Sequence, residues 1–161
     1  MKRIGVISDT HIPKAATDIP KAVYDEFQNV DMILHAGDMV VMEVFEKLKN
    51  LAPAYAVSGN MDMPDVKQMF PEKNVIKVEG VKIGLIHGYG PISKLTEVLA
   101  KEFTHISVVV FGHSHVAINK VIKKTLFFNP GSPTDKIFAV YNSFGILEVA
   151  DGKVCGKIIH L

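Results

Sequence analysis

The sequence predicts an α/β domain in which two packed β-sheets are covered on the outside by helices. In the amino-terminal half, short apolar runs typical of buried strands alternate with segments whose apolar residues recur at helical spacing. In the carboxy-terminal half, apolar runs follow one another at short intervals with turn residues between them, as in antiparallel hairpins. A chain of 161 residues with 48% hydrophobic content suffices for one core and is too short for two ordinary domains, so we expect a single domain over residues 1–161.

Composition excludes several classes of protein. A net charge of +1 gives no sign of a basic nucleic-acid surface or of a membrane-binding face. Cys155 is the only cysteine, so intrachain disulfides and thiolate metal clusters are excluded. The amino terminus lacks the apolar core of a signal peptide, and no apolar run is long enough to span a membrane. We therefore expect a soluble, cytoplasmic protein, and homo-oligomerisation stays open.

The amino-terminal half is predicted to consist of strand and helix units that run in the same direction. We expect strands at residues 2–7, 32–35 and 54–57 and helices at residues 21–29 and 41–50. This alternation predicts that the three strands are parallel neighbours in one sheet.

The carboxy-terminal half is predicted to be richer in strands. A hairpin at residues 75–78 and 81–86 is followed by a helix at residues 92–103 and by a buried strand at residues 108–111. Further strands, which we expect to form antiparallel hairpins, are predicted at residues 116–122, 125–128, 138–141, 144–149 and 154–159.

Seven polar residues follow the predicted strands, each close to a glycine or to the end of an apolar run: Asp9, His11, Asp38, Asn60, His87, His113 and His115. One such residue has an ordinary explanation, such as a helix cap, a turn or a hydrogen-bonded core group. Seven such residues at one edge of an α/β sheet are not explained in this way, because that edge is where ligands bind. Imidazoles, carboxylates and an amide oxygen suit manganese, iron or zinc, so the set predicts a dinuclear metal site.

The order of these residues resembles the calcineurin-like metallophosphoesterase superfamily, whose signature runs Asp-x-His, Gly-Asp, Gly-Asn, a lone His and Gly-His-x-His. All five blocks are present between Ile4 and Ser132. The small size, Gly-Asn-x-Asp and Asn-Pro-Gly-Ser resemble a compact group of archaeal and bacterial phosphodiesterases that share their fold with a retromer subunit. The resemblance implies a four-layer αββα sandwich of two mixed sheets flanked by helices.

The resemblance also implies a function and the roles of the site residues. Asp9, His11 and His115 would bind one ion, Asn60, His87 and His113 the other, and Asp38 would bridge them, with Asp38, Asn60 and His87 forming the catalytic centre. We expect two divalent ions, with manganese favoured over nickel, zinc or iron. A bridging hydroxide would hydrolyse a small phosphate ester, most plausibly a phosphodiester.

Two departures from the family pattern affect catalysis and substrate binding. Larger members have a histidine directly after the Gly-Asn asparagine, where it helps to protonate the leaving group, whereas this chain has Met61. Related small enzymes often have an arginine shortly after Asn-Pro-Gly-Ser, whereas this chain continues Pro133-Thr134-Asp135-Lys136. Arg3, the only arginine, precedes a strand whose other end holds the site, so it cannot substitute.

Two other functions are alternatives. The first is a non-catalytic interaction scaffold of the same fold, which the retromer relative exemplifies, although this chain keeps every ligand. The second is a nuclease, which the near-neutral charge disfavours. The remaining histidines, His35, His105 and His160, are assigned to structure or surface, with His35 the least secure because it lies three residues before Asp38.

Overall fold

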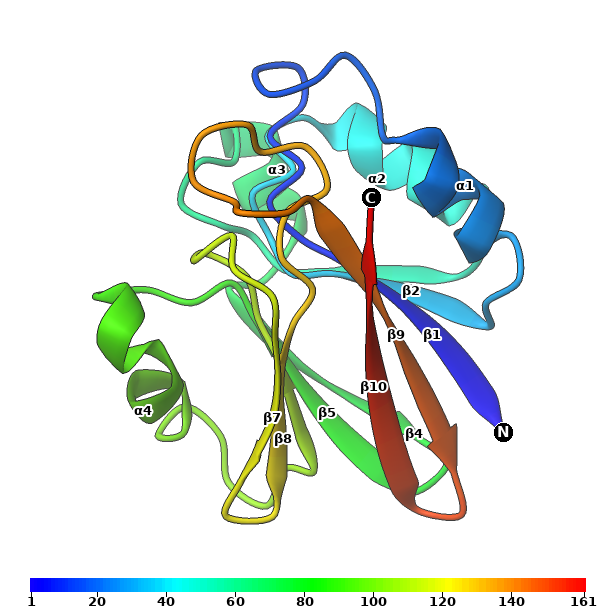
Figure 1. The fold of residues 1–161 in the computed structure, drawn as a ribbon, viewed down its shortest axis with the longest axis vertical. Coiled ribbons are helices and arrows are strands. Elements are labelled where there is room, and N and C mark those ends of the chain that lie inside the picture. Colours follow the sequence, from blue (N-terminus) through cyan, green and yellow to red (C-terminus); the bar gives the residue numbers. More distant parts are fainter.

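The computed structural model describes residues 1–161 and contains two five-stranded mixed sheets (Figure 1). The first sheet has the strand order β10-β9-β1-β2-β3, and the second has the order β4-β5-β6-β8-β7. The strands of the first sheet are β1 (Lys2–Ile7), β2 (Met32–His35), β3 (Ala54–Ala56), β9 (Ser143–Ala150) and β10 (Lys153–His160). Those of the second are β4 (Lys73–Val78), β5 (Val81–Ile86), β6 (Val108–Val110), β7 (Ile118–Ile122) and β8 (Thr125–Asn129).

Each sheet combines three parallel strands with two strands that pair antiparallel. Strands β1, β2 and β3 are parallel, as the amino-terminal alternation predicts, and β9 and β10 extend that sheet as an antiparallel hairpin. In the second sheet β5, β6 and β8 are parallel, while β4 and β7 pair antiparallel at the two edges. The parallel strands of each sheet therefore end at a common edge.

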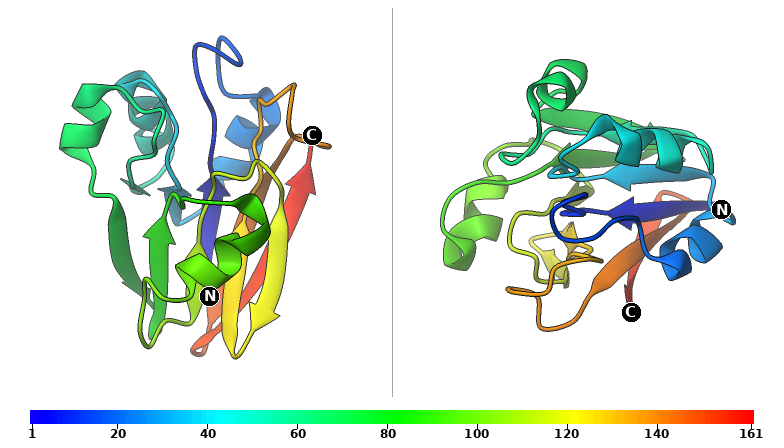
Figure 2. Two further views of the ribbon diagram at one scale, coloured as in Figure 1. Left: turned by 90° about the vertical axis from the view of Figure 1, so that its left-hand side faces the viewer. Right: turned by 90° about the horizontal axis from the view of Figure 1, so that it is seen from above.

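Four short helices cover the outer faces of the sheets (Figure 2). They are α1 (Lys21–Phe27), α2 (Met42–Lys49), α3 (Pro64–Met69) and α4 (Leu95–Leu99), the last preceded by a 3-10 turn (Ile92–Lys94). The largest apolar cluster lies between the sheets and includes Val6, Val110 and Phe128, all fully buried. Phe27 and Leu48 bury the first helices against one sheet, and Leu99 buries α4 against the other. The predicted αββα sandwich is confirmed.

Two predicted elements differ from the structure, and one helix of the structure is not predicted. The helix expected at residues 92–103 is limited to the 3-10 turn and α4, and the short helix α3 was not predicted. The strand expected at residues 138–141 is a loop. There the carboxylate of Asp135 accepts hydrogen bonds from the backbone N–H groups of Ile137, Phe138 and Ala139, which fold the segment into a turn instead of a strand. None of the helices combines the length and the apolar character that crossing a membrane requires.

Candidate metal centre

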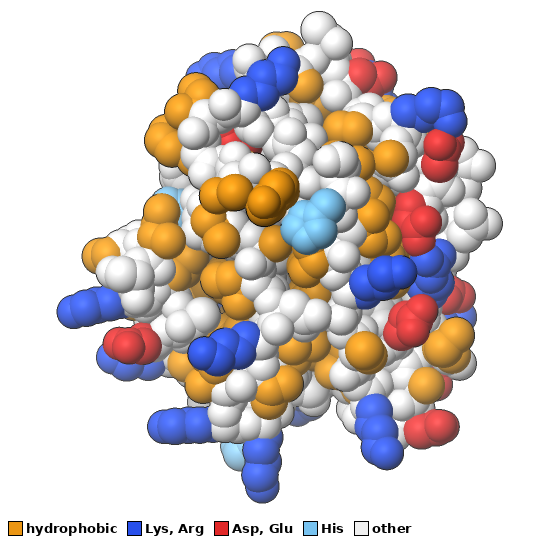
Figure 3. Space-filling view, in the orientation of Figure 1, with side chains coloured by type: hydrophobic (Ala, Val, Ile, Leu, Met, Phe, Trp, Pro, Cys, Tyr) orange, Lys and Arg blue, Asp and Glu red, His pale blue; other side chains and the backbone are white.

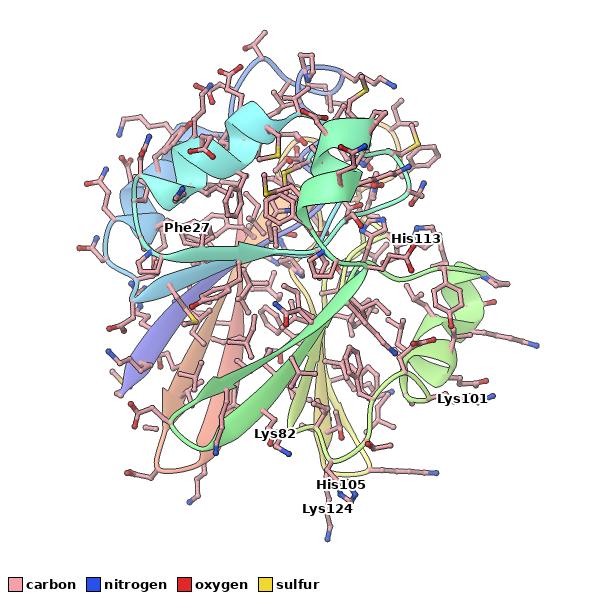
Figure 4. The ribbon with its side chains drawn as sticks, turned by 180° about the vertical axis from the view of Figure 1, so that it is seen from behind. Phe27, Lys82, Lys101, His105, His113 and Lys124 are labelled. Atoms are coloured by element: carbon pink, nitrogen blue, oxygen red, sulfur yellow. The ribbon has the colours of Figure 1, made fainter.

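The seven predicted ligands lie in loops that follow the carboxyl ends of β1, β2, β3, β5 and β6. Because these strands run parallel within each sheet, the loops come together at one end of the sandwich. In Figure 4 His113 lies at this end, whereas His105, Lys82 and Lys124 lie at the opposite end. The prediction that His105 and His160 are not part of the site agrees with their exposed positions on other elements.

Asp9, His11 and His115 form one group of potential metal ligands. The carboxylate oxygen Oδ1 of Asp9 lies 3.3 Å from Nε2 of His115 and 3.7 Å from Nε2 of His11. The two imidazole nitrogens are themselves 3.2 Å apart. Two ring nitrogens and a carboxylate oxygen that converge in this way can share one cation, which would replace the protons now between them.

Asp9, Asp38 and His87 form a second group, which shares Asp9 with the first. Nε2 of His87 lies 3.2 Å from Oδ2 of Asp38 and 3.9 Å from Oδ1 of Asp9. Oδ2 of Asp38 also lies 3.6 Å from Nε2 of His11. Both carboxylates therefore face imidazoles of both groups, although the resemblance gives the bridging position to Asp38 alone.

The two remaining predicted ligands adjoin the second group. Oδ1 of Asn60 lies 3.1 Å from Nε2 of His87. The His113 ring packs edge-on against the His87 ring, with centroids 5.4 Å apart, but its Nε2 contacts the carbonyl oxygen of Gly90 at 3.3 Å. The structure thus brings six of the seven donor atoms together and places the seventh side chain beside them.

Asp9 provides the clearest sign that the site is built to hold a cation. Its side chain is fully buried, and its Oδ1 is the one buried side-chain oxygen or nitrogen that lacks a hydrogen-bond partner. Its Oδ2 is satisfied by the Ser8 hydroxyl and the backbone N–H of His113. A buried carboxylate oxygen without a partner is costly, and a divalent ion with oxygen and imidazole ligands would remove that cost. The residues present therefore fit the expected ions.

The backbone at the site is strained in a way that points to function. Positive φ angles occur at five of the seven ligands, which are Asp9 (54°), His11 (44°), Asp38 (57°), His113 (68°) and His115 (57°). Residues other than glycine seldom adopt this conformation, which costs energy and clusters at functional sites. The fold therefore holds these side chains in orientations that the chain alone would not favour.

Two glycines and one carboxylate make the close approach of the loops possible. A Cβ atom at Gly59 would lie 2.1 Å from Oδ1 of Asp38, and one at Gly112 would lie 1.9 Å from the Ser8 hydroxyl. The carboxylate of Asp62 accepts hydrogen bonds from the backbone N–H groups of Asp38, Val40 and Gly59. Asp62 thus ties the loop after β2 to the loop after β3 and is fully engaged in doing so.

Electrostatic coupling pairs the imidazoles with the carboxylates. Burial alone would raise the pKa of Asp9, but the nearby imidazoles of His11 and His115 hold the pKa of this carboxyl well below its usual range. Burial opposes the charging of His87 and His115, yet Asp38 and Asp9 raise the pKa of His87 to about 9, and Asp9 and Asp135 raise that of His115 to about 9. Two protonated imidazoles therefore balance two carboxylates near neutral pH, and cations would bind with release of these protons.

Asp135 is a site residue that the sequence did not predict. Its Oδ2 accepts a hydrogen bond of 2.6 Å from Nδ1 of His115, which leaves Nε2 facing Asp9. Nδ1 of His87 is fixed in the same way by the carbonyl oxygen of Ala36 at 2.8 Å. Such outer contacts select the ring tautomer that can bind a metal ion. The only signal in the sequence was an acidic residue three positions after Ser132, where relatives often have an arginine.

His35 is structural, as predicted. It is buried, its Nδ1 accepts the backbone N–H of Gly37 at 3.1 Å, and its Nε2 donates to the hydroxyl of Thr10 at 3.1 Å. Both ring nitrogens are thus used in holding the loops after β1 and β2 together, and His35 has no free nitrogen for a metal ion or a substrate.

Acidification is therefore expected to destabilise the protein through His35. Burial lowers the pKa of His35 from its ordinary value of 6.5 to about 4. Between pH 4 and pH 6.5 the unfolded chain therefore binds a proton at this residue, whereas the folded chain does not. The contribution of neutral His35 to the free energy of unfolding is complete well above pH 6.5 and decreases as the pH falls, by on the order of 2 kcal/mol at pH 5. His87 and His115 act in the opposite sense between pH 7 and pH 6, because with raised pKa values the folded chain holds protons there that the unfolded chain has partly released, so the contribution of His35 has to be read from a variant at that position.

Urea denaturation at pH 7 and pH 5 measures this difference. Between pH 7 and pH 5 the variant His35→Gln should lose about 2 kcal/mol less stability than the parent, whereas His105→Gln, a change at an exposed histidine, should keep the pH dependence of the parent. Equal pH dependence in the two variants would contradict the assignment to His35.

A cavity of about 490 Å³ opens over the potential ligands. His11, Asp38, Asn60, His113 and His115 form one part of its wall. Lys14 is the only basic side chain among the lining residues, apart from the histidines. Arg3 lies at the start of β1 and pairs with Glu26, so the expectation that no arginine reaches the site is confirmed.

Comparison with known proteins gives consistent similarities. The model of the calcineurin-like phosphoesterase superfamily domain matches residues 1–152. A "probable metallophosphoesterase" of Methanocaldococcus jannaschii is 43% identical over 136 residues, which are 81% of this chain and 68% of that protein. A phosphodiesterase of the same archaeon is 29% identical over 143 residues, covering 80% of this chain and 82% of that protein.

Among solved structures, Vps29 of Entamoeba histolytica in complex with zinc is similar along nearly the whole chain. It is 26% identical, the match covers 98% of both chains, and the TM-score is 0.75. The fold is thus shared both by an archaeal phosphodiesterase and by a protein named for vacuolar protein sorting.

Proposed function

Since the chain belongs to the calcineurin-like phosphoesterase superfamily, we propose that it hydrolyses phosphodiesters at a centre of two divalent metal ions, with manganese preferred. The observation that carries this proposal is the buried, unpartnered Oδ1 of Asp9 between the imidazoles of His11 and His115. The similarity to an archaeal phosphodiesterase supports the reaction class. The single cysteine agrees with a reducing, cytoplasmic setting.

We assign the ligands as the family pattern suggests. One ion would be held by Asp9, His11 and His115, the other by Asn60, His87 and His113, with Asp38 between them. His113 would exchange its contact with the Gly90 carbonyl for the ion. When bound, the ions supply Lewis acidity to the phosphoryl oxygens and a water whose lowered pKa makes it nucleophilic near neutral pH.

The charge of the site favours diesters. Two divalent ions would bring +4, and Asp9, Asp38 and a hydroxide nucleophile would return −3, which leaves a formal charge of about +1. A phosphodiester carries one negative charge and needs no further cation. The second charge of a phosphomonoester would require an additional basic group, and the cavity lining offers only Lys14 beyond its histidines.

Removal and replacement of metal test the proposal. Protein treated with chelator should lose hydrolysis of bis(p-nitrophenyl) phosphate, and manganese should restore it more fully than zinc, nickel or iron. Turnover of the diester should exceed that of p-nitrophenyl phosphate. Full activity after chelation, confirmed by elemental analysis to have removed the metal, would show that the reaction does not use these ions.

A non-catalytic scaffold remains the second candidate, because Vps29 has the same fold. The complete set of ligands argues against it, since converging buried carboxylates and imidazoles are unfavourable without ions to hold. A metal-loaded protein that binds two ions and hydrolyses no phosphate ester would favour the scaffold.

Metal is also expected to raise the melting temperature. Binding only to the folded state at 100 times the dissociation constant stabilises by about 2.7 kcal/mol per site, or about 5–10 °C for a domain of this size. The apoprotein should still unfold cooperatively, because the core between the sheets includes none of the seven ligands. Calorimetry with and without manganese measures both quantities, and a broad, non-cooperative apoprotein transition would contradict the expectation.

A further inference from the structure

Part of the wall of the cavity is apolar. Met61, Ile92, Ile137 and Phe138 line it together with the aliphatic residue Ala15. Ile137 is 81% exposed and Phe138 71% exposed, so two consecutive large apolar side chains lie in solvent at the cavity, and contiguous exposed apolar surface can mark a binding groove. In Figure 3 apolar side chains gather on the upper part of the face shown, where Figure 1 places the loop between β8 and β9 in orange.

The loop that carries Ile137 and Phe138 is anchored to the candidate metal centre. Asp135 accepts the backbone N–H groups of Ile137 and Phe138 through the same carboxylate that fixes His115. The side chain of Asn142 donates to the backbone carbonyl of Asp135 at 2.6 Å and closes the loop at its other end. The Phe138 ring lies edge-on to the His115 ring, with centroids 6.0 Å apart. The backbone of both residues is therefore fixed, and the Phe138 ring lies beside a potential metal ligand.

We propose that Ile137 and Phe138 bind an apolar ester group of a soluble phosphodiester, so that the cavity selects substrates with one negative charge and one hydrocarbon substituent. This inference rests on the proposed function, to which it adds the substrate class. The lining has one lysine to meet the phosphate and four large apolar side chains to meet the substituent. A cavity of about 490 Å³ has the size of a site for a small organic molecule.

The test varies only the ester group that does not leave. The manganese-loaded full chain is given p-nitrophenyl phosphodiesters whose second group is methyl, ethyl, propyl or butyl, so that the leaving group and its pKa stay constant. A fully buried methylene is worth about fourfold in affinity, and in this open cavity we expect kcat/KM to rise about twofold for each methylene. The rise should come mainly through KM, because the substituent does not take part in bond breaking.

Matched variants of one loop locate the effect. Ile137→Ser and Phe138→Ser should flatten the dependence on chain length. Val140→Ser should leave it unchanged, because Val140 is 79% exposed in the same loop but does not line the cavity. Binding of dimethyl and dibutyl phosphate, measured by calorimetry in the same four proteins, gives a readout that does not depend on turnover.

The outcomes separate this inference from the proposed function. A flat series with normal turnover would overturn the inference and leave the phosphodiesterase assignment intact. Tighter binding of dibutyl phosphate that depends on Ile137, without turnover of any ester, would support the inference while the proposed reaction fails. Binding of the protein to phosphatidylglycerol vesicles that Ile137→Ser abolishes would assign the loop to a membrane surface instead and overturn the inference.

Discussion

Asp38→Ala is expected to lower phosphodiester hydrolysis at least about 10³-fold, more than alanine at any other predicted ligand. A metal ion supplies several kcal/mol of charge stabilisation in the transition state, and each 1.36 kcal/mol corresponds to a factor of ten. Oδ2 of Asp38 lies 3.2 Å from Nε2 of His87 and 3.6 Å from Nε2 of His11, so its loss affects ligands of both ions. Alanine at His11 or Asn60 would remove a ligand of one ion only.

Rates, metal content and thermal unfolding of the variants are the measurements. Asp38→Asn keeps an oxygen that can accept the backbone N–H of Met61, which Oδ1 of Asp38 now accepts at 2.7 Å, but removes the charge. It should therefore fold normally and still lose most activity. Asp65→Ala, a change at an exposed carboxylate of α3, should leave the rate unchanged. A larger loss in Asp9→Ala than in Asp38→Ala would make Asp9 the shared ligand, as its place in both ligand groups allows.

The sequence predicted those parts of the site that depend on local order along the chain. Asp9, Asp38 and His87 lie within three residues of the ends of β1, β2 and β5, so the end of a strand fixes their position. The register of parallel strands then brings them together without further information.

The features that were missed depend on contacts between distant segments. Asp135 reaches His115 only because the loop after β8 folds back over the loop after β6, and no local pattern signals that contact. The apolar run at residues 138–141 was predicted as a strand because apolar character usually means a core, whereas Phe138 lines a cavity. Helix α3 has only six residues and one buried side chain, Val66, so its periodicity was too short to recognise.

The state of His35 could not be predicted from the sequence either, and the structure bears directly on how a leaving group is protonated. A buried imidazole whose two nitrogens are occupied by Gly37 and Thr10 cannot deliver a proton to the cavity. This removes one alternative donor. Met61, in contrast, is 44% exposed and lines the cavity, at the position where the family pattern has the histidine that helps to protonate the leaving group.

Met61→His is therefore expected to accelerate the hydrolysis of esters with poor leaving groups by roughly 10²–10⁴-fold, the usual effect of general acid catalysis. A thioether has no proton to give, so the parent enzyme should expel a phenoxide, whose conjugate acid has a pKa of about 10, far more readily than an alkoxide. Plots of log kcat/KM against leaving-group pKa for aryl and alkyl diesters should be steep in the parent and shallow in Met61→His. Met63→His, at a half-exposed methionine two residues further on that does not line the cavity, is the matched control and should keep the steep slope. Parallel plots for the parent and Met61→His would mean that position 61 has no part in protonation and that another group, such as Lys14, supplies the proton.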